Sequence, residues 1–283
     1  MKNVVLSLCL IVIACSSYGQ KIYFRAGGGY GLPVATQSIG LNYFYLFDPQ
    51  VQEETYTVED VPGSFGAGAN FNVGAGYMFS QYLGVDLNIQ YLKSKKYELY
   101  DKEHTIGQSV EDQFTTVNAN AIFINPALII TPGTGSKVPY GRFGVIIGAP
   151  KIKGKESYYS DEDGIEEEEI EWEMKKGTAF GFQGAVGLNW AIANTLDIYA
   201  ELNFISMTYY PGEMELTKDV YNGDDMLDDM DVRQKKVVFK KKVESGGPSD
   251  PNEPFEALRE PHPFSSVSLQ LGVKFTLGGR AAD

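Results

Sequence analysis

Bulky apolar residues recur at every second position in a series of segments through most of this 283-residue chain. In GFQGAVGLNWAIANTLDIYAELNF, which begins at Gly181, they alternate with Gly, Ala, Asn, Gln and isolated acidic residues. A period of two places one set on each face of a β-strand. The stretch therefore predicts two strands with one apolar face each, joined by a turn at Asn194 and Thr195.

Eight segments share this alternation, which makes the pattern far more specific than any one of them. Pro126, within the fourth segment, is an exception because proline cannot donate a ladder hydrogen bond. The eight comprise 21–32, 69–79, 82–92, 115–130, 140–149, the two strands between 181 and 204, and 266–277.

The connections between these segments alternate in length. Those after the second, fourth and sixth strands are short, whereas those after the first, third, fifth and seventh are long: 33–68, 93–114, 150–176 and 211–265. An even number of antiparallel strands with short turns at one end is the plan of a bacterial outer-membrane barrel. We therefore predict an all-β fold, an eight-stranded antiparallel up-and-down transmembrane β-barrel over residues 20–277, with short periplasmic turns and long extracellular loops.

The composition of the two strand faces decides which one meets lipid. A soluble barrel would turn its apolar face inward and present Lys and Glu to water. Here the other face carries Gly, Ala, Asn, Ser and Gln, which suit the crowded lumen of a small barrel. The bulky face is uninterrupted over about 10 residues, the length that a tilted strand needs to cross hydrocarbon. This favours an apolar exterior and a polar interior.

The N-terminus has the features of an export signal. Lys2 precedes an apolar segment too short to span a bilayer, and Gly19 ends a small-residue cleavage motif. We predict a signal peptide over 1–19 and location in the bacterial outer membrane. The alternative is a lipoprotein site at Cys15. Both cysteines, Cys9 and Cys15, lie in this segment, so cleavage after Gly19 leaves none for disulfides or thiol chemistry.

Strand patterns such as FNVGAGYMF and VSLQLGVKFTL resemble the OmpA-like family of small outer-membrane barrels, of the outer membrane protein beta-barrel domain type. The resemblance covers about Gln20 to Leu277. It implies contact with outer-membrane lipid and lipopolysaccharide, insertion by the barrel-assembly machinery, and a monomer. Only a short tail, 278–283, follows the barrel, so the family's C-terminal peptidoglycan-binding domain and cell-wall anchoring are not implied.

Five charged residues fall on the inward face of the predicted barrel: Arg25, Asp86, Arg142, Glu201 and Lys274. Buried charges are costly unless paired, so we expect a network of ion pairs in the lumen. An eight-stranded barrel has little free interior, which favours a structural plug over a gate for ions. The net charge of −13 argues against nucleic acid as a partner.

The fifth connection is strongly acidic, with nine acidic residues and no basic one from Asp161 to Glu173. Asp161, Asp163, Glu167 and Glu169 form a weak candidate site for Ca²⁺ or Mg²⁺. The spacing of a calcium-binding loop is not matched, and a solvated acidic loop is the preferred interpretation. No cofactor is expected.

The same connection contains alternating lysines and glutamates that predict a protruding hairpin, closing near Asp163 and Gly164. If Lys153 pairs with Glu171, the two residue numbers add up to an even number. In the adjoining barrel strands, partners on the same face have residue numbers that add up to an odd number. An extra residue must lie between the two registers. We expect this β-bulge within a residue or two of Pro150, where a ladder donor is missing.

Signals for enzymatic chemistry are sparse. The chain has two histidines, His104 and His262, both outside the eight strands. His262 lies near Ser265 and Ser266, which only weakly suggests a lipid-A-modifying enzyme. The leading hypothesis is therefore a non-enzymatic barrel that anchors acidic surface loops for envelope integrity or surface interaction. The main alternative is a conduit for small or apolar solutes, as OmpW-like relatives suggest.

Overall fold

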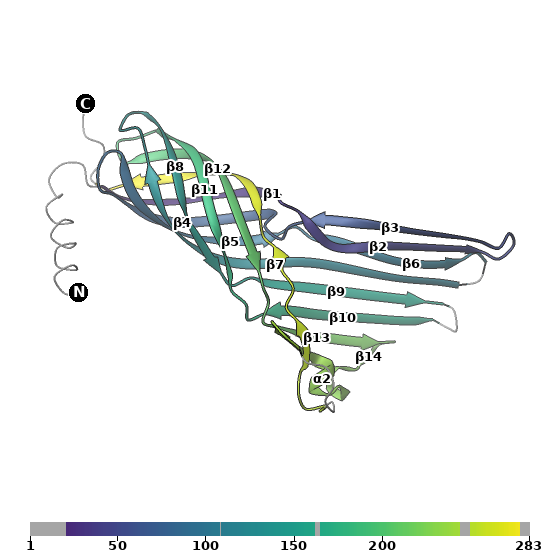
Figure 1. Cartoon of the computed structure of the whole chain (residues 1–283). Coiled ribbons are helices and arrows are strands. Elements are labelled where there is room, and N and C mark those ends of the chain that lie inside the picture. The colour runs from purple at the N-terminus through teal and green to yellow at the C-terminus, as the bar shows by residue number, and fades with distance from the viewer. Residues whose placement is uncertain (1–20, 108, 162–164, 244–249, 278–283) are drawn as a thin grey trace.

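The computed structural model describes residues 21–107, 109–161, 165–243 and 250–277, and most of them lie in β-strands (Figure 1). The expected signal peptide, the C-terminal tail and Asp163 lie outside these residues. Helical structure in the described ranges is limited to a 3₁₀ turn at Leu227–Asp229 and one turn, α2, at Val232–Lys235. Within those ranges no helix has the length and apolarity needed to cross a membrane.

Eight strands close into an antiparallel barrel, as the alternation predicts. Each pairs with the next, and the last pairs with the first, so no edge is left open. In order they are β1 (Lys21–Pro33), β4 (Gly68–Met78), β5 (Leu83–Ser94), β7 (Ser109–Ile130), β8 (Lys137–Gly148), β11 (Ala179–Ala191), β12 (Leu196–Tyr209) and β18 (Ser266–Thr276).

The barrel exterior is apolar. Side chains at alternate positions of every barrel strand are exposed, while their neighbours along the strand are mostly buried. This is the reverse of a soluble protein and matches a surface in contact with lipid. The exposed set includes Phe24, Phe71, Val73, Leu87, Ile122, Leu128, Phe143, Val186, Leu202, Leu269 and Leu271.

Pro126 interrupts one ladder of the barrel wall. The pairing of β7 with β8 is missing at Asn125 and Pro126 and resumes on either side. The Asn125 side chain donates from Nδ2 to the Val145 carbonyl oxygen at 2.6 Å, which supplies a hydrogen bond where the ladder has none. The strand thus tolerates its proline because a neighbouring amide partly compensates.

Beyond the barrel, the four long connections combine into one further sheet, here called the outer sheet (Figure 1). β7 belongs to both structures: its C-terminal half lies in the barrel and its N-terminal half in the outer sheet. The other strands are β2 (Gln37–Asp48), β3 (Glu53–Gly63), β6 (Tyr97–Thr105), β9 (Lys151–Ser160), β10 (Glu166–Lys175), β13 (Glu213–Tyr221), β15 (Lys236–Lys240) and β16 (Phe255–Leu258).

The outer sheet has the order β3-β2-β6-β7-β9-β10-β13-β15-β16. Its pairs are antiparallel except β2 with β6 and β15 with β16. Two-residue strands β14 (Asp224–Asp225) and β17 (His262–Pro263) pair with β13 and β12. The long connections are therefore an ordered sheet that continues the barrel wall.

The expected β-bulge at Pro150 is wrong in its position. The pairing of β7 with β8 and then β9 keeps one register across Pro150. The extra residue lies on the opposite strand, between the end of β10 and the start of β11, where Lys176 adopts a φ of 60°. Lys153 accordingly pairs with Glu173 rather than Glu171. The sum of the residue numbers of two cross-strand partners is odd in the barrel and even in the hairpin. This change requires an extra residue, but it does not say which strand contains it.

A hydrophobic core fills the junction between barrel and outer sheet. Phe65 and Phe264 come from segments next to strand ends, and their backbones are held by Phe65 N–H to Pro263 O and Phe264 N–H to Met207 O. Their rings pack at centroid distances of 5.7 Å from each other and 5.8 Å from Tyr97 or Tyr209. Burial of this aromatic group stabilises the junction and blocks that end of the lumen.

Candidate functional site

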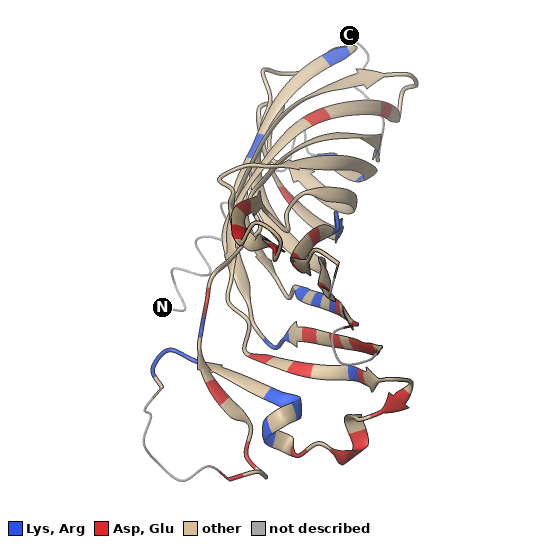
Figure 2. Ribbon diagram, turned by 90° about the vertical axis from the view of Figure 1, so that its right-hand side faces the viewer, with Lys and Arg blue, Asp and Glu red and all other residues tan. Residues whose placement is uncertain are grey.

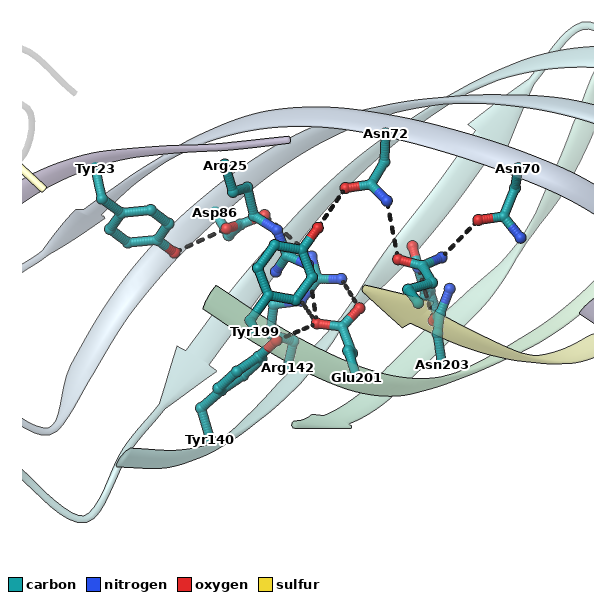
Figure 3. A network of polar contacts seen from close by, with 12 residues as sticks. Tyr23, Arg25, Asn70, Asn72, Asp86, Tyr140, Arg142, Tyr199, Glu201 and Asn203 are labelled. Atoms are coloured by element: carbon teal, nitrogen blue, oxygen red, sulfur yellow. Dashed lines mark hydrogen bonds and ion pairs between the residues drawn. The ribbon is translucent and has the colours of Figure 1, made fainter. Parts of the chain in front are cut away.

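Four charged side chains meet in the middle of the lumen, and we call this group with two tyrosines the lumen network (Figure 3). Its members are Tyr23, Arg25, Asp86, Tyr140, Arg142 and Glu201. The four charged residues are no more than 5% exposed. The network is therefore a layer of charge that is almost completely removed from solvent.

Four strands of the barrel wall supply this network. Tyr23 and Arg25 share β1, Tyr140 and Arg142 share β8, and Asp86 and Glu201 lie on β5 and β12. A fifth strand, β18, carries Lys274. Because side chains alternate in direction along a strand, all of these positions point into the barrel.

Glu201 lies at the centre of the lumen network. Its carboxylate accepts hydrogen bonds from Arg25 Nη2 at 3.1 Å, from Arg142 Nε at 3.0 Å and Nη2 at 2.7 Å, and from Tyr140 Oη at 2.9 Å. The two bonds from Arg142 are a bidentate contact, the geometry in which a guanidinium pairs most strongly with a carboxylate.

Asp86 is the second acid of the lumen network. It accepts a hydrogen bond from Arg142 Nη1 at 3.1 Å and another from Tyr23 Oη at 2.7 Å. Arg142 therefore bridges both acids, while the Arg25 guanidinium lies 4.3 Å from the ring centroid of Tyr199. Two arginines and two acids balance in charge, as buried ions must.

Two further charges flank the network toward the turn end of the barrel. The ammonium group of Lys274 lies 4.4 Å from the ring centroid of Tyr23. Asp197 is 6% exposed and pairs in register with Lys274. Asp197 is an inward charge beyond the five predicted from the sequence, and it has the same strand parity as Glu201. With Asp197, three cations face three anions.

Amide side chains form a second polar layer on the other side of the charges (Figure 3). Gln270 bridges Asn70 and Asn72 at 3.1 and 3.0 Å, and the Tyr199 hydroxyl donates to Asn72 at 3.2 Å. Gln183 donates to Asn203 at 2.8 Å. Several of these contacts join strands that are not neighbours in the barrel wall, so they hold the lumen closed across its width.

The free space in the lumen is small. A recess of about 190 Å³ at the turn end is lined by Tyr23, Asn189, Asp197 and Lys274, among others. A second cavity, beside Arg25 and Tyr199, has a volume of only about 10 Å³. A cavity needs about 10–15 Å³ to hold one water molecule. The charged layer therefore leaves room for little more than a single water.

Of the acidic residues proposed for cation binding, Asp163 lies outside the described residues, and the other three are not gathered around one point. Asp161 accepts a hydrogen bond from the Val110 amide at 2.7 Å. Glu169 is bound by Lys155 and Lys218, whose hydrogen bonds lower the pKa of its carboxyl to about 2. Glu167 lies on the same face of β10, two positions away. Across the described ranges, no group of three His, Cys, Asp or Glu residues is placed to hold a metal ion.

The residues considered for lipid-A chemistry also have other roles. His262 lies against Phe65, with ring centroids 6.2 Å apart, and burial lowers the pKa of its imidazole. The Ser265 hydroxyl accepts a hydrogen bond from the Met207 amide at 3.2 Å. His104 instead contacts Asp112 at 2.8 Å, far along the outer sheet. His262 and Ser265 thus serve the packing of the junction core.

The closed barrel, its apolar exterior and its filled lumen define a small outer-membrane barrel, and comparison with protein families agrees. The family model described as outer membrane protein beta-barrel domain matches residues 6–233. The chain belongs to this family. No curated protein matches the sequence.

Solved structures with similarity to the chain include outer-membrane proteins from three bacteria. OprG from Pseudomonas aeruginosa has 9% identity and a TM-score of 0.43, covering 92% of this chain and 96% of that one. Ail, the attachment invasion locus protein of Yersinia pestis, has 10% identity and a TM-score of 0.32, covering 91% and 97%. A major outer membrane protein from Thermus thermophilus has 14% identity and a TM-score of 0.35, covering 92% and 100%.

Proposed function

We propose that this protein is a non-enzymatic outer-membrane barrel whose main task is to hold the outer sheet at the cell surface. The observation that carries the proposal is the continuation of barrel strands into that sheet while the lumen is filled. A filled lumen supports anchoring over transport, and an ordered sheet offers a surface for contacts or for envelope integrity. The chain would be exported by its signal peptide, inserted by the barrel-assembly machinery and remain a monomer.

A conductance measurement distinguishes a barrel that only anchors the outer sheet from one that transports solutes. Purified protein inserted in planar bilayers should show no steady ion current, because the charged layer leaves space for about one water. A variant in which Arg142 and Glu201 are both replaced by alanine should also carry no steady current, since the junction core still blocks the other end of the lumen. Discrete currents through the unaltered protein would favour the conduit instead.

The surface role can be tested by shortening the outer sheet without altering the barrel. Leu41 and Asp60 are partners in the β2–β3 hairpin, so a tight turn can replace the residues between them. Cells with this variant should keep a heat-modifiable barrel but lose the surface contacts or detergent resistance that the full chain provides. Full restoration of both by the shortened chain would contradict the proposed role.

The barrel is also expected to contact lipopolysaccharide in the outer membrane. Lys151 and Lys153 contact Glu173 and lie on the side of β9 that continues the lipid-facing surface, which supports contact with lipopolysaccharide phosphates. The proposed absence of enzymatic activity on lipid A can be tested separately. Lipid A from cells with and without the gene should give the same mass spectrum, and a gene-dependent change in acylation would overturn it.

A further inference from the structure

The two faces of the outer sheet differ sharply in charge. We call the face that continues the lumen the inner face, and the face that continues the lipid surface the outer face. The register of β6, β7, β9, β10 and β13 assigns each residue to one face. No lysine or arginine of these five strands lies on the inner face, whereas the acids there are Asp101, Glu103, Glu111, Glu156, Glu166, Glu168 and Asp219.

The lysines of these strands lie on the outer face, and most of them form ion pairs with glutamates there. Glu169 binds Lys155 and Lys218, and Glu173 lies 3.4 Å from Lys151 and 3.5 Å from Lys153. The outer face is therefore close to neutral over β9 and β10, and the acids of the inner face are not balanced on their own side of the sheet. Figure 2 shows how densely acidic residues gather in this part of the molecule, compared with the barrel.

A pocket opens among these inner-face acids. It has a volume of about 190 Å³ and is lined by Gln113, Glu156, Tyr158, Glu168 and Ile170, from β7, β9 and β10. Glu156 is oriented by its neighbours: it accepts from Trp172 Nε1 at 2.8 Å and from Gln113 Nε2 at 3.3 Å. The pocket thus has two carboxylates, one aromatic ring and one aliphatic side.

Asp219 does not line the pocket itself but lies beside its Ile170 wall, and its burial is an independent observation in favour of a cation. It is the register partner of Ile170 on the inner face, it is 2% exposed, and its Oδ1 has no hydrogen-bond partner among the described residues. A buried carboxylate oxygen without a partner is costly. Glu156 and Asp219 are the register partners of Ile170 on its two sides, and Glu168 lies two positions away on the same face of β10, so the three carboxyls are neighbours on the sheet. Burial, Asp219 and Glu156 raise the pKa of Glu168.

The shape of the pocket selects the kind of cation. The two lining carboxyls, of Glu156 and Glu168, border a space far larger than a metal ion, and no metal cluster is formed by the described acids. A cation on an aliphatic chain would use every wall: carboxylates for its N–H groups, the Tyr158 ring for its charge, and Ile170 for its methylenes. We propose that this inner-face pocket binds an organic cation, namely an ammonium or guanidinium group on an aliphatic chain.

This inference rests on the proposed function, because it gives the surface sheet a ligand chemistry. The same group can come from a free amine or from a Lys or Arg side chain of a partner protein. Two probes distinguish these sources: agmatine, a guanidinium on a short free chain, and the blocked pentapeptide Gly-Gly-Arg-Gly-Gly. A free-amine site should bind agmatine and exclude the peptide, whereas a side-chain site should bind both.

Trp172 provides the signal for the titration, because its Nε1 is hydrogen-bonded to Glu156 in the pocket wall. The chain has two tryptophans, so Trp190→Phe leaves Trp172 alone. Each probe is titrated into this protein in detergent micelles at low salt, and emission should change to saturation with agmatine. Replacing Glu168 by Gln together with Asp219 by Asn should weaken binding by roughly tenfold or more.

Glu167→Gln is the matched control, because it removes a neighbouring acid from the outer face. It should leave the agmatine affinity unchanged, and gel mobility before and after heating shows that every variant is folded. The proposal is overturned if agmatine gives no saturable change, if Mg²⁺ gives the same one, or if the Glu168→Gln, Asp219→Asn variant binds normally. Since the shortened hairpin tests the surface role by itself, failure of one idea is distinguishable from failure of the other.

Discussion

Removing the Glu201 carboxylate is the sharpest test of how the barrel interior is held together. Glu201→Ala deletes the acceptor of four hydrogen bonds, from Arg25, Arg142 and Tyr140. Both guanidinium groups stay buried, and of the network's two acids only Asp86 remains. Breaking a buried ion pair from one side costs about 3–5 kcal/mol, because it leaves an uncompensated charge. The free energy of unfolding should fall by this amount.

The assay is equilibrium unfolding by urea in lipid vesicles, followed by tryptophan emission, for the unaltered protein and for each variant. The control is Glu59→Ala, an acid exposed on β3, whose effect should stay within about 0.5 kcal/mol. The double variant Arg142→Ala, Glu201→Ala should cost less than the sum of the two single changes, since it removes both partners of a pair. A loss below about 1 kcal/mol for Glu201→Ala, or strict additivity, would refute the reasoning.

Three further outcomes follow from the structure. Phe264→Ala should lower the free energy of unfolding by about 3–5 kcal/mol, because its ring is fully buried in the junction core, and the same urea titration measures it. Lys218→Met should raise the pKa of the Glu169 carboxyl from about 2 toward its usual range, as a carbon-13 NMR titration would show, whereas Lys102→Met should not. The lowered pKa means that this ion pair stabilises at neutral pH and is lost as the pH falls through about 2. At Lys176, with its φ of 60°, Lys176→Val should be less stable than Lys176→Gly by about 1–2 kcal/mol, and equal stability would contradict the bulge assigned there.

The barrel and its inward charges could be predicted from sequence because a period of two assigns every strand residue to one face. Arg25, Asp86, Arg142 and Glu201 needed only that parity to be placed in the lumen. The contacts among these four residues could not be predicted from parity alone. Strands separated by many residues must close into a ring before Arg142 can reach both acids. Asp197 has the same parity as Glu201, so the same rule places it in the lumen as well.

In the outer sheet, only the hairpin of β9 and β10 is predicted by alternating lysines and glutamates, and its register is not. β10 reads EEEEIEWEMK, in which glutamate occupies both faces, and the parallel pairing of β2 with β6 joins segments far apart in the chain. Phe65 and Phe264 lie outside the regular alternation, so their meeting in the junction core depends on tertiary packing alone. The bulge at Lys176 shows a similar limit: residue sums reveal that a register changes, but backbone conformation decides where.

β7 gives the molecule a mechanical property. Its 22 residues form one uninterrupted strand, with about ten fixed in the barrel wall and the remainder in the outer sheet. At about 3.3 Å per residue, the part in the outer sheet extends roughly 40 Å along the strand. β6 and β9 are hydrogen-bonded to the two sides of this part of β7 and stiffen it, while its other end is fixed in the barrel wall. A pull on the tip of the sheet would therefore act on the barrel as a torque, and the load would fall on the wall where Pro126 already leaves the ladder incomplete.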